Sequence, residues 1–193
     1  LLAMLVGNGG HLDRAAISET LSGLSPRDRK SLKALGVIVG ALDVFHPALL
    51  KPESVRVRLA LDAAREGRTM PALPMPGLTI LDRPAPDLAA GGAAAGFRAF
   101  GSQMVRIDIV ERIARALHEQ RAGGSPFPLD SSFAVSLGIG QDTLVRILRA
   151  LGFRQAAGQP GRDLWRWRGQ PRPRSGAPRA ANPSFAALGA WGA

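Results

Sequence analysis

The longest apolar run in the chain, LGVIVGALDVFHPALL at residues 35–50, restricts the fold more than any other feature. A helix that crosses a bilayer needs about 20 consecutive apolar residues, and this run is shorter and is interrupted by two glycines and Pro47. It also carries Asp43 and His46, which are costly to place in hydrocarbon. We therefore expect no membrane span here and interpret the run as the hydrophobic centre of a folded module.

Residues 1–68 alternate between helical and strand patterns on either side of this run. Asp13 is a suitable cap for a first helix, and Ser25 followed by proline is a typical start for a second one. The β-branched residues of 37–45 favour two short strands with a glycine bend between them. Pro52 then opens a further helix. These signals predict a compact N-terminal module of helix, helix, short strand pair and helix.

Residues 69–103 have a different composition, with five prolines and the run AAGGAAAG. Segments rich in proline, glycine and alanine resist regular packing. We therefore predict a linker or long loop here, partly ordered around residues 78–81, that separates two modules. The length of 193 residues is compatible with one or two hydrophobic cores.

Residues 104–169 carry the clearest helical pattern. In MVRIDIVERIARALHEQR the apolar residues recur at helical spacing and predict an amphipathic helix. A short helix capped by Asp130 or Ser131, with Phe133 facing inward, is expected next. A glycine-containing turn at 138–140 then leads into a helix over residues 141–151, whose leucines and isoleucine form one stripe.

The end of this segment has the pattern of a β-hairpin. In LWRWRG, Trp165 and Trp167 alternate with Arg166 and Arg168, and period-two alternation is typical of a strand. We expect both tryptophans to pack in the core of the hairpin rather than to stack on bases. Helix, short helix, turn, helix and hairpin is the element order of a winged helix. Residues 170–193 are expected to form a flexible tail rich in arginine and proline.

The predicted fold is therefore mainly α with small β elements. It combines a helical and short-strand N-terminal module, a linker and a winged-helix-like C-terminal module, followed by the tail. The module boundaries are placed at residues 1–68, 69–103, 104–169 and 170–193.

The positive charge is concentrated near the C-terminus. The formal net charge is +10, and nine arginines but only one acid, Asp163, occur between residues 146 and 179. This excess favours an anionic partner, nucleic acid first and an acidic membrane surface second. The alternative is that the arginines only solvate the surface of an arginine-rich protein. The candidate nucleic-acid-binding residues are Arg146, Arg149, Arg154, Arg166 and Arg168, with Arg56 and Arg58 as secondary candidates.

Signals for catalysis or metal binding are sparse. The absence of cysteine excludes disulfides, thiol nucleophiles and cysteine-ligated zinc, and it fits a reducing, cytoplasmic setting. His11, His46 and His118 have no metal-ligand partner at i+3 or i+4. The glycine run at residues 91–96 lacks the Lys-Ser/Thr of a phosphate-binding loop. We therefore expect no catalytic residue, metal, cofactor or small-molecule substrate in this chain by itself.

Five segments follow one another along the chain: GHLDRAAI, DRKSLKALGVIVGALDVFHPALLKPESVRVRLAL, GFRAFGSQMVRIDIVERIA, SFAVSLGIGQDTLVRILRALGFR and NPSFAAL. Together they resemble the C-terminal region of a group of bacterial superfamily-two helicases, mainly alphaproteobacterial. That group is similar to the ATP-dependent RNA helicase of the mitochondrial RNA-degrading complex. The resemblance covers most of the chain and is weakest across residues 69–95.

The resemblance implies two upstream RecA-like motor domains that bind ATP and Mg²⁺ and move along nucleic acid, with the present residues as an accessory region. The start Leu-Leu-Ala-Met fits a piece of a longer polypeptide. No motor motif occurs in this chain, so no catalytic residue is carried over, and the choice between RNA and DNA stays open. Two rival hypotheses are a non-enzymatic winged-helix DNA-binding regulator, with residues 141–151 in a major groove, and an interaction scaffold whose basic tail binds an acidic protein.

Overall fold

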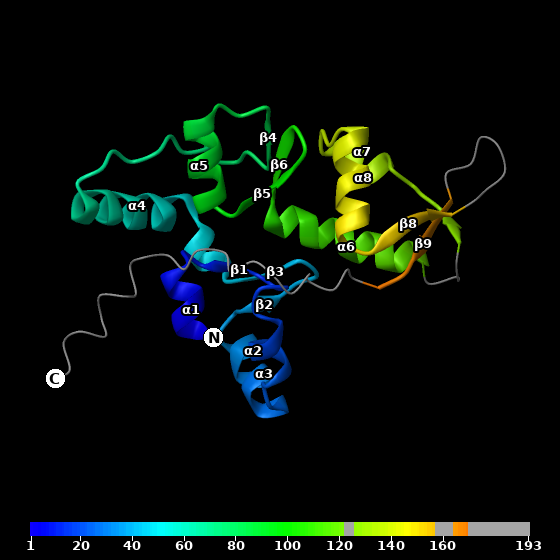
Figure 1. Cartoon of the computed structure of the whole chain (residues 1–193), viewed down its shortest axis with the longest axis horizontal. Helices are drawn as coiled ribbons and strands as arrows, with labels where there is room; N and C mark the ends of the chain where they lie inside the picture. The colour runs from blue at the N-terminus through cyan, green and yellow to red at the C-terminus, as the bar shows by residue number, and fades with distance from the viewer. Residues whose placement is uncertain (122–125, 157–163, 170–193) are drawn as a thin grey trace.

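The computed structural model describes residues 1–121, 126–156 and 164–169, without the side chain of Phe133. These residues form three antiparallel three-stranded sheets with helices packed around them, with about 49% helix and 18% strand (Figure 1). The fold is mixed α/β. The prediction of a mainly α chain with small β elements is therefore correct only in part, because the short strands are organised into three sheets. The predicted tail and the inward orientation of Phe133 lie outside the described residues.

The N-terminal unit is built on the first sheet, whose strand order is β1-β3-β2. Its helices and strands are α1 (Leu2–Gly7), β1 (His11–Asp13), α2 (Ser18–Ser22), α3 (Pro26–Ala34), β2 (Ile38–Val39) and β3 (Asp43–Phe45). Val44 of β3 is fully buried and lies in a core with Leu5, Leu12 and Leu32. The apolar run of residues 35–50 thus supplies the centre of this unit, and the predicted strand pair is confirmed.

The first predicted helix boundary is wrong. Asp13 does not cap a helix but ends β1, where its Oδ1 accepts a hydrogen bond of 2.8 Å from Ala15 N and closes a turn. α2 begins only at Ser18. The second boundary is confirmed, because Ser25 and Asp28 form a capping box with proline at the first helical position.

A 3₁₀ turn, η1 (Pro47–Leu50), leads from β3 into the long helix α4 (Pro52–Glu66). The predicted start of this helix is confirmed. Val55, Leu59 and Ala63 form its buried stripe, and Gly67 ends it in a left-handed conformation with φ of 62°.

The segment predicted as a linker contains regular structure. Its elements are β4 (Ile80–Asp82), α5 (Pro86–Ala94) and β5 (Phe97–Phe100), and together with β6 (Gln103–Arg106) the strands form the central sheet β4-β6-β5. Leu81, Phe97 and Met104 form its small core. The order expected around residues 78–81 agrees with β4, but the linker prediction is wrong for residues 86–103. The physical reason is that α5 packs closely: a Cβ at Gly91 would collide with Ala72 O, and one at Gly92 would lie 2.8 Å from Leu81 Cδ1.

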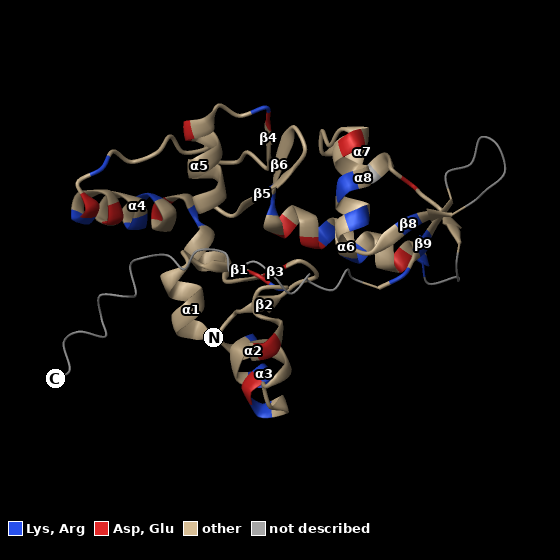
Figure 2. Cartoon of the chain, viewed as in Figure 1, with Lys and Arg blue, Asp and Glu red and all other residues tan. Residues whose placement is uncertain are grey.

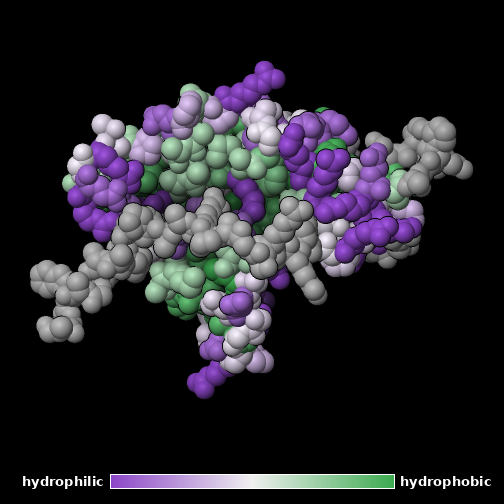
Figure 3. Space-filling view, viewed as in Figure 1, coloured by the Kyte–Doolittle hydropathy of each residue, from purple (hydrophilic) through white to green (hydrophobic). Residues whose placement is uncertain are grey.

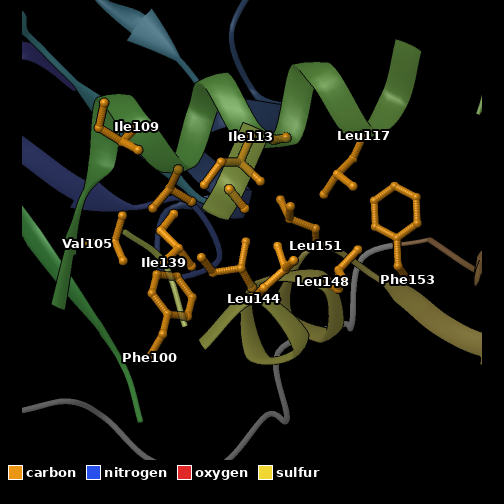
Figure 4. Packing of buried hydrophobic residues seen from close by; sticks show 14 of the residues in the cluster. Phe100, Val105, Ile109, Ile113, Leu117, Ile139, Leu144, Leu148, Leu151 and Phe153 are labelled. Atoms are coloured by element: carbon orange, nitrogen blue, oxygen red, sulfur yellow. The ribbon is translucent and has the colours of Figure 1, made fainter. Parts of the chain in front are cut away.

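The C-terminal unit contains the largest core of the described residues. Its elements are α6 (Ile107–Gln120), β7 (Phe127–Pro128), α7 (Ser132–Ser136), α8 (Gln141–Ala150), β8 (Phe153–Ala156) and β9 (Leu164–Trp167), with sheet order β7-β9-β8. Figure 4 shows side chains of α6 directed toward the apolar stripe of α8. The predicted stripe of α8 is confirmed, since Leu144, Ile147, Leu148 and Leu151 are at most 2% exposed.

The start of the amphipathic helix differs from the sequence pattern. Met104 and Val105, at the start of the segment with the helical pattern, belong to β6. α6 begins at Ile107, and its predicted stripe is confirmed, because Ile107, Val110, Ile113, Ala114 and Leu117 are buried. β6 passes into α6 with no residue between them, so the central sheet and the C-terminal unit are directly connected. No helix among the described residues is long and apolar enough to cross a membrane.

Candidate nucleic-acid interface

Arg146 and Arg149 lie on the solvent side of α8, because Leu144, Ile147 and Leu148 turn the opposite side into the core. Figure 2 shows basic residues along α8 and on the neighbouring hairpin. In the space-filling view, hydrophilic side chains cover the same region (Figure 3). The structure therefore places both arginines where a partner can reach them.

Two further candidates, Arg154 and Arg166, lie directly opposite each other on β8 and β9. Both are exposed, while their neighbours Phe153 and Trp165 are buried on the other face of the hairpin. Opposite residues in an antiparallel pair have Cβ atoms about 5 Å apart, and like charges in this position destabilise the pair. Neither guanidinium has an ion pair with a described acid. The pair thus concentrates positive charge that the described residues leave uncompensated.

Main-chain oxygens hold Arg154 in place. Its Nη1 donates hydrogen bonds of 2.8 Å to Arg149 O and to Phe153 O. The contact with Arg149 O joins the hairpin to the last turn of α8, where a cation is favourable because carbonyl groups point outward. Arg149, Arg154 and Arg166 therefore belong to one surface, and exposed Arg168 follows on the same strand face as Arg166. We call these four residues the arginine surface.

Arg146 lies at the edge of this surface and is partly engaged. Its Nε contacts Asp142 Oδ2 at 3.0 Å, and a Cβ at Gly101 would lie 2.7 Å from the same Nε. Gly101 belongs to the turn between β5 and β6, which packs on the start of α8. There Thr143 Oγ1 donates to Phe100 O at 3.3 Å, and Thr143 is only 2% exposed. The N-terminal part of α8 is thus covered on one side.

The tryptophans of the hairpin pack against the protein. Trp165 is 3% exposed, which confirms its predicted core position. Trp167 is half-buried, and its Nε1 donates to Leu151 O at 3.1 Å. The guanidinium of Arg121 lies 4.3 Å from the Trp167 ring centroid, a favourable cation–π contact. The sequence pattern did not single out Arg121, because the contact joins residues from two separate elements.

The secondary candidates, Arg56 and Arg58, do not join the arginine surface. Both lie on α4, at the other end of the molecule from β8 and β9 (Figure 1). Arg58 Nη2 donates to Ala94 O at 2.8 Å, and burial lowers the pKa of Arg58 while Asp62 opposes that effect. Arg58 is therefore a packed side chain that connects α4 to α5, whereas Arg56 remains exposed.

The three histidines lie in different environments. Burial, together with nearby arginines, lowers the pKa of His11. A ring nitrogen of His46 lies 2.9 Å from Leu35 O, and the His118 ring contacts Phe153 and Trp167. Among the described residues, no group of three or more His, Asp or Glu side chains is arranged to hold a metal ion.

A polar cluster that sequence reasoning missed joins the N-terminal unit to the central sheet. Arg98 of β5 donates to Asp43 Oδ1 at 2.7 Å and to Asp13 Oδ2 at 2.9 Å. The carboxylates lie 55 and 85 residues away from Arg98 in the sequence, so no local spacing connects the three side chains. Only the antiparallel pairing of β1 with β3, which aligns Asp13 with Asp43, brings them together.

The comparisons with known proteins give no match: no protein-family model fits the chain, and neither curated proteins nor solved structures are significantly similar to it.

Proposed function

We propose that this chain is a nucleic-acid-binding accessory region of a cytoplasmic ATP-dependent helicase, and that its C-terminal unit is a winged-helix-like module. The element order from α6 to β9 and the strand order β7-β9-β8 support the second part of this proposal. The sequence resemblance supports the first part. ATP and Mg²⁺ would bind motor domains that are not among these 193 residues.

The opposed pair Arg154 and Arg166 carries the nucleic-acid part of the proposal. Arg154 and Arg166 have no ion pair with an acid among the described residues, so a bridging anion would reduce their repulsion, and the arginine fork is suited to phosphate oxygens. Arg149 and Arg168 extend the same surface along α8 and β9. Binding of this kind follows the sugar-phosphate backbone, so we expect little sequence preference and strong dependence on salt.

The contacts at the start of α8 favour this function over the rival regulator. A helix that reads bases presents its N-terminal residues to the major groove. Here the turn between β5 and β6 covers one side of that region, and Gly140 N donates to Gln103 Oε1 at 2.9 Å. The arginine surface at the other end of α8 is open, which supports a backbone contact.

Charge reversal of the arginine surface tests the proposal. Arg149, Arg154 and Arg166 would be changed together to glutamate. The matched control reverses three exposed cations of α3, Arg27, Lys30 and Lys33, which changes the net charge by the same amount. Fluorescence anisotropy would measure binding to labelled single-stranded RNA, single-stranded DNA and duplex at roughly 50 and 200 mM salt.

We expect the arginine variant to lose roughly tenfold or more in affinity and to bind with a salt slope smaller by about 2 to 3, whereas the control changes little. Equal losses of affinity in both variants would mean that binding depends only on the total charge of the protein. Unchanged binding in the arginine variant would reject the surface and favour the scaffold hypothesis. A large preference for one duplex sequence would favour the regulator. For the helicase part, an upstream reading frame without GxxxxGK[ST] and Asp-Glu motifs would contradict the proposal.

A further inference from the structure

A cavity of about 710 Å³ lies between the N-terminal unit and the central sheet. Its walls come from α1, β1, β3, the end of α5, β5, β6 and the start of α6. Small-molecule sites commonly have volumes of roughly 300 to 1,000 Å³ and often occur between structural units. The size and position of this cavity therefore fit a ligand site that is separate from the arginine surface.

The lining of the cavity includes both apolar and charged side chains. Met4, Ile17, Phe97 and Met104 supply large apolar side chains. The charged lining residues are Asp13, Asp43 and Arg98, so two carboxylates share a single guanidinium. Arg98 already donates to both of them. The lining therefore carries one negative charge in excess, in a chain whose total charge is +10.

The carboxylate of Asp43 is buried, and this environment disfavours its charged form. Burial raises the pKa of Asp43 to about 6, Asp13 and Glu111 add to the rise, and Arg98 opposes it. One oxygen, Oδ1, accepts from Arg98, while Oδ2 accepts no hydrogen bond from the described residues. A positively charged N–H donor from a ligand would compensate the charge and use this free oxygen.

We propose that this cavity binds a small organic cation, a protonated amine attached to an apolar body. The ammonium group lies against Asp13 and Asp43, and the apolar body packs on Phe97, Met104 and Ile17. A metal ion does not suit the site, because the described residues provide no group of three or more ligating side chains. An anion would meet the excess negative charge. The inference is independent of the proposed binding of nucleic acid.

The test uses the full chain and three probes of similar shape: 2-phenylethylamine, 2-phenylethanol and 3-phenylpropanoate. Calorimetric titration at neutral pH would measure their affinities. We expect the amine to bind roughly tenfold more tightly than the alcohol and the acid not to bind, because one charge-assisted hydrogen bond distinguishes the first two probes.

Two variants and a control keep the result specific. Asp13→Asn removes one charge but keeps an oxygen that can accept from Ala15 N. This variant should bind the amine roughly fivefold or more weakly, with unchanged affinity for the alcohol. Ala16→Trp places a large side chain at an exposed position of the cavity lining and should abolish binding of both the amine and the alcohol. Asp82→Asn, at the exposed end of β4, should change neither affinity. Circular dichroism and thermal melting would verify that each variant is folded.

Several outcomes would overturn the proposal. Equal binding of amine and alcohol would show that charge plays no part, and preferential binding of the propanoate would indicate an anion site. Amine binding that survives Ala16→Trp in a folded protein would place the ligand elsewhere. Absence of amine binding at millimolar concentration would reject the site itself.

Discussion

Replacing Asp43 with asparagine tests the electrostatics at the junction between the N-terminal unit and the central sheet. The Asp43 side chain is only 8% exposed, and its pKa is raised from 3.8 to about 6 by burial and by the carboxylates of Asp13 and Glu111, against the effect of Arg98. The folded protein therefore binds this proton more tightly than the unfolded chain does. Ionisation of Asp43 opposes folding, although its ion pair with Arg98 offsets part of the effect.

The direction and size of the pH dependence follow from this shift. Protonation of Asp43 stabilises the folded protein. This stabilisation is fully present below pH 3.8 and is lost as the pH rises through about 6. The whole rise corresponds to about 3 kcal/mol. Between pH 7 and pH 5 the protonation of Asp43 alone should increase the free energy of unfolding by about 1 kcal/mol. His11 and His118, whose pKa values are lowered, act in the opposite direction.

Urea unfolding followed by circular dichroism at pH 5 and pH 7 would measure the effect in the wild type and in Asp43→Asn. The histidines contribute to both proteins, so they cancel when the two pH dependences are subtracted. We expect the wild type to gain about 1 kcal/mol more than the variant on acidification. If both proteins responded equally, or if the variant gained more, the assigned environment of Asp43 would be wrong.

Three further substitutions test the packing of the fold through the free energy of unfolding. Leu148→Ala empties a fully buried position on α8 and should cost about 2 to 5 kcal/mol in urea unfolding; a loss below this range would contradict the described core. Ser25→Ala removes the capping box of α3 and should cost about 1 kcal/mol, an effect that Ser25→Asp should largely avoid. Gly91→Ala introduces a Cβ against Ala72 O and should destabilise by about 1 to 3 kcal/mol, with faster proteolysis of the chain before α5. A stabilised Gly91→Ala protein, which helix propensity alone predicts, would refute the close contact.

The elements with strong local signals could be predicted from the sequence. The stripe of α8, the proline starts of α3 and α4 and the alternation of β9 each reflect a pattern within a few residues. Periodicity alone determines which side of such an element is buried. For the same reason, the exposure of Arg149 and Arg166 could be predicted before the structure was known.

Features that depend on distant parts of the chain could not be predicted in this way. Glycine and proline between residues 69 and 103 indicated a flexible linker, but Gly91 and Gly92 are needed because other segments approach α5 too closely for a side chain. Met104 and Val105 lie at the start of the segment with the helical pattern, yet pairing with β4 and β5 places them in a strand. The opposition of Arg154 and Arg166 required the register of the hairpin, which composition does not specify.

The direct passage from β6 into α6 has a mechanical consequence. β6 is the central strand of its sheet and ends at Arg106, and the helix that carries the C-terminal core begins at the next residue. Turning α6 relative to the central sheet would require bending the helix or breaking strand hydrogen bonds, because no loop separates β6 from α6. In the proposed function, a pulling force on a nucleic acid bound at the arginine surface would be transmitted through the C-terminal core and α6 to the central sheet and, through Arg98, to the N-terminal unit.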